Sequence, residues 1–358
     1  MLSTIAKPFA ALALAAALIS IVLAALGASP LGVFAALGEG AFGNWYACAD
    51  TIVKSTPLVF TGLAVALAFS GALWNIGADG QLTIGAIAAG AIGPHLGNFP
   101  HAIAIAIILA AGALGGAVWG AVAGWLRARR DVNEVISTIM LNFVAVQALS
   151  WVVHGPLMEP SRAYPTSSPI ARAAQIEFYF APSRINLGMI LAVALAAACY
   201  LLLFRTGAGF ELRAMGRNRR AATFFGIRIP ALTLWVMALS GALAGLGGAV
   251  QISAISHRLY EKLSPGWGFE AIAVALVARL NPLGVIPAAI LFGALDNGSQ
   301  AMQRTQGISP ELVQVIQGLV ILIILAFDTP AWSGLREQIF GASGDAAAVP
   351  PVAEMPDA

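Results

Sequence analysis

The feature that most limits how this chain can fold is a series of apolar stretches, each close to the length of a bilayer crossing. About 20 apolar residues are needed for a helix to span the hydrocarbon core. Of the 358 residues, 59% are hydrophobic and only 10% are charged, whereas soluble domains carry about a quarter charged residues. The sequence therefore predicts an all-α polytopic membrane protein with about ten transmembrane segments. These are 8–28, 55–74, 81–96, 101–125, 134–154, 186–204, 231–255, 267–280, 283–298 and 311–327.

The predicted organisation follows from these segments. Residues 1–28 are interpreted as a retained transmembrane helix and not as a secretory signal, because the apolar run is long for a signal. The remaining divisions are an external loop at 29–54, a first core region at 55–154, an external loop at 155–185, a linking helix at 186–204, a cytoplasmic segment at 205–230, a second core region at 231–327 and a disordered cytoplasmic tail at 328–358.

The basic residues indicate which loops face the cytoplasm. Arginines concentrate in two loops that ten crossings place on the same side, and this asymmetry is the positive-inside pattern. It predicts a plasma membrane protein with both termini in the cytoplasm. The arginines concerned are Arg127, Arg129, Arg130, Arg205, Arg213, Arg217, Arg219, Arg220 and Arg228.

Two of the apolar stretches are interrupted by polar and helix-breaking residues. One break lies at 75–81 and the other at 279–282, where Pro282 follows Asn281. Such breaks in corresponding positions of two halves are typical of transporters built from internal repeats, with the substrate path beside the breaks. We therefore expect broken or re-entrant segments, and a structural repeat that relates 55–154 to 231–327.

Glycines recur every four residues in two of the predicted helices. Gly112, Gly116, Gly120 and Gly124 form a smooth strip on one face of the fourth segment, and Gly241 and Gly245 do the same in the seventh. Small residues in this spacing allow helices to approach closely in lipid. These faces are predicted to be helix-packing surfaces.

Polar side chains inside apolar segments are candidates for the lining of a translocation path, because burying them in a membrane is costly. A path lined in this way would hydrogen-bond a hydroxylated substrate. Under the structural alternative, the same side chains cap the broken helices and satisfy free backbone amides. The candidates are Asn75, Asp79, Gln81, Asn142, Glu270 at the start of the eighth segment, and Asn297 near the end of the ninth.

Several kinds of site are absent from the sequence. No lysine follows a glycine, so there is no phosphate-binding loop for ATP. The four histidines lack the spacing of metal ligands, and Cys48 and Cys199 are better read as isolated small residues than as a disulfide. We expect no enzyme activity, metal site or cofactor bound by this chain itself.

Four stretches resemble one family of membrane proteins in their residues and in their order along the chain. They are 75–81 (NIGADGQ), 134–142 (EVISTIMLN), 268–276 (GFEAIAVAL) and 281–285 (NPLGV). The sequence is similar to permeases of the branched-chain amino acid and ribose importer superfamily, within its simple-sugar and nucleoside branch. The resemblance covers about residues 55–327.

This resemblance implies the rest of a transport machine. Such permeases pair with a second, similar permease, a cytoplasmic ATPase that binds ATP and Mg, and an external substrate-binding protein. The segment 211–227 looks like the family's ATPase-coupling segment, although Arg219 stands where proline is usual. The coupling residues implied are Glu211, Arg213, Gly216, Asn218, Ala221, Ala222 and Gly226.

The expected function is inward transport by alternating access, powered by a separate ATPase subunit. A nucleoside is the first choice of substrate and a pentose or other simple sugar is the second. One alternative is an ion-coupled secondary transporter that uses Asp79 or Glu270 as a proton or sodium site. Another is a passive channel. The ion-coupled alternative leaves the arginine-rich segment 205–230 unexplained, whereas broken half-helices also suit a channel.

Overall fold

A computed structural model describes residues 29–178 and 183–307, with a few single positions on either side. The predicted segments 8–28 and 311–327 fall mostly outside these ranges, as does the predicted tail 328–358. Residues 31–313 form one compact unit, and residues 1–30 with 314–358 form another. Everything below concerns the first unit.

The described residues are helical and contain no β-strand, only isolated bridges in the loops. Among the helices that the structure describes, five (α3, α5, α6, α7 and α10) are long and apolar enough to cross a membrane, which confirms the all-α polytopic class. The α-helices are α2 (Pro30–Phe42), α3 (Trp45–Ser70), α4 (Ala78–Ile92), α5 (His101–Arg130), α6 (Glu134–His154), α7 (Leu187–Arg205), α8 (Gly207–Arg217), α9 (Arg219–Phe224), α10 (Ile229–Val250), α11 (Trp267–Val277) and α12 (Pro282–Gln306). Short turns of 3-10 helix lie at Gly93–Asn98 and Arg172–Ala174, and a π-helical turn at Gln251–Ser256 extends α10.

Residues 29–54 are mostly helical, so their prediction as a loop is wrong. They contain α2 and the first turns of α3, which starts after Asn44, whose side chain accepts a hydrogen bond from the Ala47 amide at 2.9 Å. The charge of Lys54 interrupts the apolar pattern, but its ammonium group lies 2.9 Å from the carboxylate of Asp296 on α12. This distant partner is what the local sequence could not indicate.

Both predicted breaks are present. The chain leaves α3 through Ala72, which has a left-handed φ of 53°, and resumes as α4 at Ala78. Between α11 and α12, Arg279 and Leu280 both have left-handed φ values, 52° and 58°. The gap between the predicted segments 231–255 and 267–280 is also present, between the π-helical turn that ends at Ser256 and the start of α11 at Trp267.

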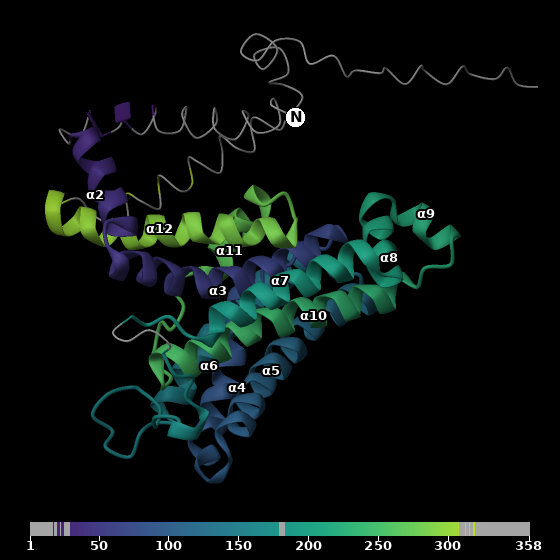
Figure 1. The fold of residues 1–358 in the computed structure, drawn as a ribbon. Coiled ribbons are helices and arrows are strands. Elements are labelled where there is room, and N and C mark those ends of the chain that lie inside the picture. The colour runs from purple at the N-terminus through teal and green to yellow at the C-terminus, as the bar shows by residue number, and fades with distance from the viewer. Residues whose placement is uncertain are drawn as a thin grey trace, which may run out of the picture. The chain divides into compact units, whose positions relative to one another are not determined.

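The glycine faces of α5 and α10 are helix-packing surfaces, as predicted, and they pack against each other (Figure 1). A Cβ added to Gly116 would overlap the carbonyl oxygen of Gly241, and one added to Gly112 would lie 2.9 Å from the carbonyl oxygen of Gly245. Backbones approach this closely only where side chains are absent. The seam extends to α4, because a Cβ at Gly85 would also overlap Gly245.

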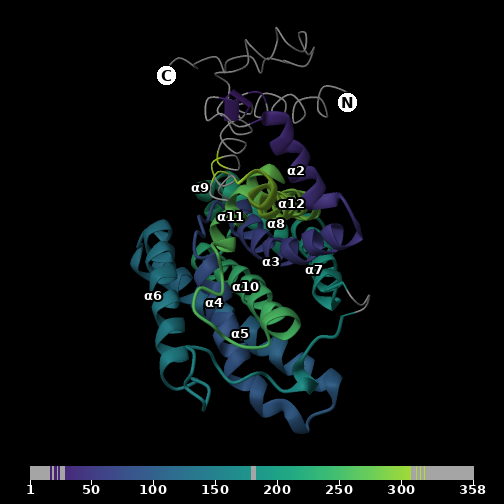
Figure 2. The same cartoon turned by 90° about the vertical axis from the view of Figure 1, so that its left-hand side faces the viewer.

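Two long helices, α3 and α10, organise the remaining contacts. Helix α10 packs on α5 and α4, whereas α3 packs on α12 and α11, and α3 and α10 also contact each other. Helix α6 packs mainly on α4 and α5, and Figure 2 shows it at their edge. Several large apolar side chains on α6, including Phe143 and Trp151, are therefore exposed.

Candidate functional site

The break between α3 and α4 is held by a pair of buried amide side chains. The Asn75 Nδ2 donates to Gln81 Oε1 at 3.0 Å, and the Gln81 Nε2 donates back to Asn75 Oδ1 at 3.1 Å. Asn75 Nδ2 also donates to the Ser240 hydroxyl of α10 at 2.8 Å, and Ser240 donates in turn to the Ala64 carbonyl of α3 at 2.6 Å. Both amides are almost completely buried, so the pair fixes the broken segment to two neighbouring helices.

Asn142 ties α6 to the same break. Its Nδ2 donates to the Ile76 carbonyl at 2.8 Å, and its Oδ1 accepts from the Gly80 amide at 2.8 Å. These are backbone groups that the interruption of the helix leaves without regular partners, so one side chain satisfies both. Thr138, one turn earlier on α6, lies beside the Ile76 amide at 3.3 Å.

Asp79 connects the beginnings of two short helices. It lies in the first turn of α4, and its Oδ1 accepts from the Gly268 amide in the first turn of α11 at 3.0 Å and from the Ser264 hydroxyl at 2.6 Å. A Cβ on Gly268 would overlap the Asp79 backbone, so the two helix starts are in direct contact. A carboxylate is favoured where helix N-termini converge, because their dipoles place partial positive charge there.

Glu270 lies on the same helix start as Gly268. Its side chain is half-buried and within electrostatic range of Asp79 and Asp296. Within the described part of the chain its carboxylate has no hydrogen bond or ion pair. Trp267 is three residues earlier, on the same face of α11, and is also half-buried. The Glu270 carboxylate is therefore an available hydrogen-bond acceptor, and the Trp267 indole lies beside it. Both are next to the contact between the starts of α4 and α11, which we call the junction.

Asn297 lies elsewhere. It is in the middle of α12, which continues to Gln306, so the expectation that it marks the end of a segment is wrong. Its Nδ2 donates to the carbonyls of Gly40 and Ala47, both at 3.0 Å. These bonds hold the turn between α2 and α3 against α12. Of the six predicted path residues, the structure brings Asn75, Asp79, Gln81 and Asn142 together, with Glu270 adjacent, and separates Asn297.

The predicted coupling segment consists of two short helices. Leu212 and Met215 of α8 are buried, and a Cβ at Gly71, just past the end of α3, would overlap Leu212 and lie 3.0 Å from Met215. Gly216 also faces inward, since a Cβ there would overlap the Ser70 carbonyl. Helix α8 is thus docked on the end of α3 immediately before the Asn75 break.

The turn into α9 explains how Arg219 can stand where similar permeases usually have a proline. The Asn218 side chain accepts from the Ala221 amide at 3.0 Å and caps α9. Arg219 is the first residue of the helix, a position that favours proline without requiring it. The remaining implied coupling residues divide by burial. Ala222 is buried, Arg213 and Ala221 are half-buried, and Glu211 and Gly226 are exposed.

Sequence reasoning did not identify Phe224 and Phe225. Phe224 ends α9 and Phe225 caps it, and 93% and 86% of their surfaces are exposed, more than for any other large apolar side chain described. Exposed aromatic side chains of this size are typical anchors of protein interfaces. Only the folded arrangement, in which Leu212 and Met215 turn inward, shows that these two phenylalanines remain outside.

The Asn75–Gln81 pair provides a first prediction. We expect Asn75→Ala to lower the free energy of unfolding by about 2–4 kcal/mol, because it leaves the buried Gln81 amide and the Ser240 hydroxyl with fewer partners. Thermal unfolding of the purified protein in detergent measures this effect. Gln300→Ala, which truncates an exposed amide on α12, is the control. Equal melting temperatures for the two variants would contradict the assigned role.

The fold and the junction together define a class of protein. It is a helical membrane protein in which broken helices surround a polar centre and an amphipathic segment packs on the end of a membrane-spanning helix. The chain belongs to the family of branched-chain amino acid transport system permease components, whose match covers residues 47–325. It is accordingly the membrane-spanning permease subunit of an ABC importer, with ATP hydrolysis carried by a separate subunit. This assignment decides against the ion-coupled and channel alternatives.

Individual relatives agree. The chain is 33% identical to the guanosine ABC transporter permease protein of Bacillus subtilis, over 90% of this chain and 93% of the relative. It is 31% identical to the glucose ABC transporter permease protein of Haloferax volcanii, over 85% and 83% of the two chains. A nucleoside ABC transporter permease protein of Lactococcus lactis is 30% identical over 85% and 86%. No solved structure matches the fold.

Proposed function

We propose that this permease moves a nucleoside inward across the plasma membrane, with a simple sugar as the second candidate. The observation that carries the proposal is the junction of α4 and α11, where Asp79 holds two helix starts together and Glu270 remains available. Two of the relatives named above are permeases for nucleosides and one is a permease for glucose. Both substrate classes present hydroxyl donors.

The junction suits a hydroxylated ring. The Glu270 carboxylate can accept hydrogen bonds from vicinal hydroxyl groups, and the Trp267 indole on the same face can stack on a base or sugar. Asn75, Gln81 and Asn142 have their amides engaged within the protein, so in this proposal they position the path wall without contacting substrate. Asp79 has the same positioning role, through its bond to Gly268.

The proposed machine contains a second permease, a cytoplasmic ATPase and an external substrate-binding protein. Two relatives in Bacillus subtilis are both guanosine ABC transporter permease proteins, and Lactococcus lactis has two nucleoside ones. Such pairs favour a heterodimer for this chain as well. The ATPase would engage α8 and α9 through Phe224 and Phe225, together with the implied residues Glu211, Asn218 and Gly226.

The proposed topology has ten crossings, both termini in the cytoplasm, and a repeat that relates 55–154 to 231–327. The packing of each half's long helix on the other half supports the repeat. In each half the long helix packs on two helices of the other half: α3 packs on α11 and α12, and α10 packs on α4 and α5. Each half also contains an interruption after its long helix, at 71–77 and at 257–266. In this arrangement the counterpart of the first break is the interruption at 257–266 and not the predicted break at 279–282.

Uptake measurements test the substrate. Cells that lack this chain should recover uptake of labelled guanosine when it is expressed again with its partner subunits, whereas uptake of labelled ribose should not change.

A second prediction concerns Glu270. Glu270→Gln should raise the KM for uptake about tenfold, because it weakens a hydrogen bond between the substrate and a charged acceptor. ATPase activity should change little. Glu261→Gln removes an exposed carboxylate outside the junction and is the control.

Each result has a separate meaning. Recovery of ribose uptake alone would replace the nucleoside by a sugar and leave the machine unchanged. An unaltered KM for Glu270→Gln would contradict the assignment of Glu270 to the substrate. Uptake that continues after removal of the ATPase subunit would contradict the proposed coupling.

A further inference from the structure

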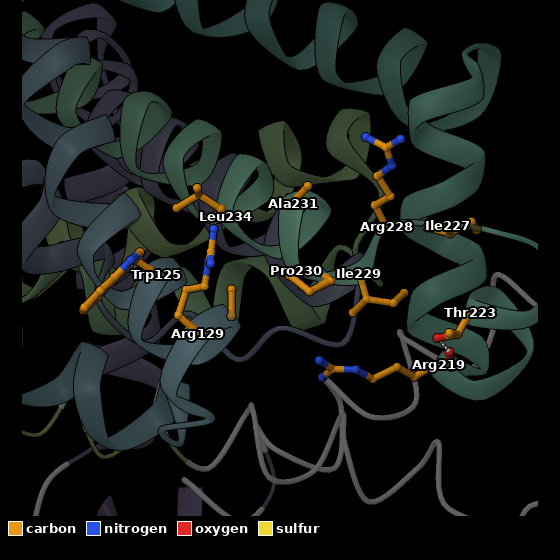
Figure 3. A pocket seen from close by; sticks show the side chains of 11 residues that line it. Trp125, Arg129, Arg219, Thr223, Ile227, Arg228, Ile229, Pro230, Ala231 and Leu234 are labelled. Carbon is orange, nitrogen blue, oxygen red and sulfur yellow. Dashed lines mark hydrogen bonds between the residues drawn. The ribbon is translucent and has the colours of Figure 1, made fainter.

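A pocket with a volume of about 810 Å³ lies where α5 ends and α10 begins, with α9 forming a third wall. Figure 3 shows its side chains, with Trp125 and Leu234 on one side and Arg219 and Thr223 on the other. The volume is within the range of sites for small organic ligands, about 300–1,000 Å³. The full lining is Trp125, Ala128, Arg129, Arg219, Thr223, Ile227, Arg228, Ile229, Pro230, Ala231 and Leu234.

The charge of the pocket is not balanced locally. Three arginines, Arg129, Arg219 and Arg228, line it, and no acidic residue does. Over residues 29–178 and 183–307, none of the three guanidinium groups has a hydrogen bond or ion pair. Arg127, two residues before Arg129 on α5, shows the contrast, because it pairs with Asp131 at 2.7 Å and with Glu134 at 3.1 Å.

The position of the pocket relates it to the membrane surface. Both α5 and α10 are long and apolar enough to span the membrane. Arg129 lies in the last turn of α5 and Arg228 caps the start of α10, whereas Arg219 is the first residue of α9. The apolar part of the lining runs from these ends along the same helices, and Trp125 and Leu234 are 46% and 37% exposed. The pocket is therefore cationic at the level of the headgroups and apolar toward the hydrocarbon.

We propose that this pocket binds the headgroup of an anionic phospholipid, with the phosphate on the arginines and the acyl chains along α5 and α10. Basic pockets between transmembrane helices are suited to such headgroups. A soluble anion would use the arginines but not the adjoining apolar wall. Because Arg219 and Thr223 belong to α9, the lipid would also hold the proposed coupling segment to the end of α5.

The test measures retention of lipid by the purified full chain. The protein is prepared in detergent, mixed with dioleoyl phosphatidylglycerol or dioleoyl phosphatidylcholine, and analysed by native mass spectrometry. The pocket variant is Arg129→Gln with Arg219→Gln and Arg228→Gln. The matched control removes three arginines of the loop 155–185, as Arg162→Gln with Arg172→Gln and Arg184→Gln. Ala231→Trp fills the pocket without changing its charge, and circular dichroism establishes that each variant is folded.

We expect the unmodified chain and the loop variant to retain phosphatidylglycerol in preference to phosphatidylcholine. The pocket variant should bind phosphatidylglycerol about 100-fold more weakly, given the electrostatic attraction of each arginine to an anionic surface, and Ala231→Trp should also lose it.

Equal losses in the two triple variants, or retention by Ala231→Trp, would overturn the proposal. Displacement of the lipid by millimolar inorganic phosphate would identify a soluble-anion site instead. Unchanged lipid binding with failure to assemble with the ATPase would identify a protein interface instead.

Discussion

Gly116→Leu should abolish folding of this permease, the largest effect that the structure predicts for a single residue. The side chain would be placed where the carbonyl oxygen of Gly241 now lies, with the Gly245 Cα 2.7 Å from the new Cβ. Neither neighbour is a flexible side chain that could rotate away, so α5 and α10 must separate. Overpacking of cores usually costs about 1–3 kcal/mol, and displacement of two backbones should exceed that.

Size-exclusion chromatography of a fluorescent fusion in detergent measures this outcome as loss of the monodisperse peak. Gly38→Leu is the matched control, because Gly38 is also a helical glycine but has no atom within 4 Å of an added Cβ. It should behave like the unmodified chain. A normal peak for Gly116→Leu would mean that the α5–α10 seam is not as close as described.

The second large effect is expected at the exposed aromatic pair. Phe224→Ala with Phe225→Ala should reduce substrate uptake and ATPase association more than tenfold, because aromatic anchors at the centre of an interface contribute about 2 kcal/mol or more each. The fold should be unaffected, since neither side chain packs on the rest of the chain. Co-purification with the ATPase subunit and uptake of labelled guanosine are the two measurements.

Phe99→Ala with Phe178→Ala is the matched control for this pair. Both residues are exposed phenylalanines, at 46% and 42%, and lie outside the segment 205–230. Their removal should leave association unchanged. Should the Phe224 and Phe225 variant associate and transport normally, the ATPase contact would have to lie on another surface. Arg219 is unchanged in the Phe224 and Phe225 variant. A loss of ATPase association in that variant would therefore show that the aromatic contact is distinct from the lipid pocket.

Much of the fold could be predicted because a bilayer imposes simple length and composition rules. Apolar runs identified α5, α6 and α7 closely, and the glycine spacing identified the two faces that meet between α5 and α10. The polar stretch 75–81 identified the break after α3. The same rules failed at 29–54, where Lys54 interrupts the apolar run but is paired with Asp296 in the fold.

The candidate site was predicted in its residue types but not in its arrangement. Asn75, Asp79, Gln81 and Asn142 were each selected because polar groups inside apolar segments need partners. Their partners are Ser240, Gly268 and the backbone of the break, and most of these lie far away in the sequence. A pattern in one segment cannot specify which distant helix comes within hydrogen-bonding distance.

The sequence by itself determined that the chain is a helical membrane permease with interrupted helices, because hydrophobic length, glycine spacing and family motifs are local properties. Only the tertiary structure decided that Asp79 joins α4 to α11, that Asn297 instead secures the α2–α3 turn, and that Phe224 and Phe225 face outward. These outcomes depend on how helices pack, and packing is determined by all the contacting surfaces together. The basic pocket at the ends of α5 and α10 likewise exists only because three separate segments meet there.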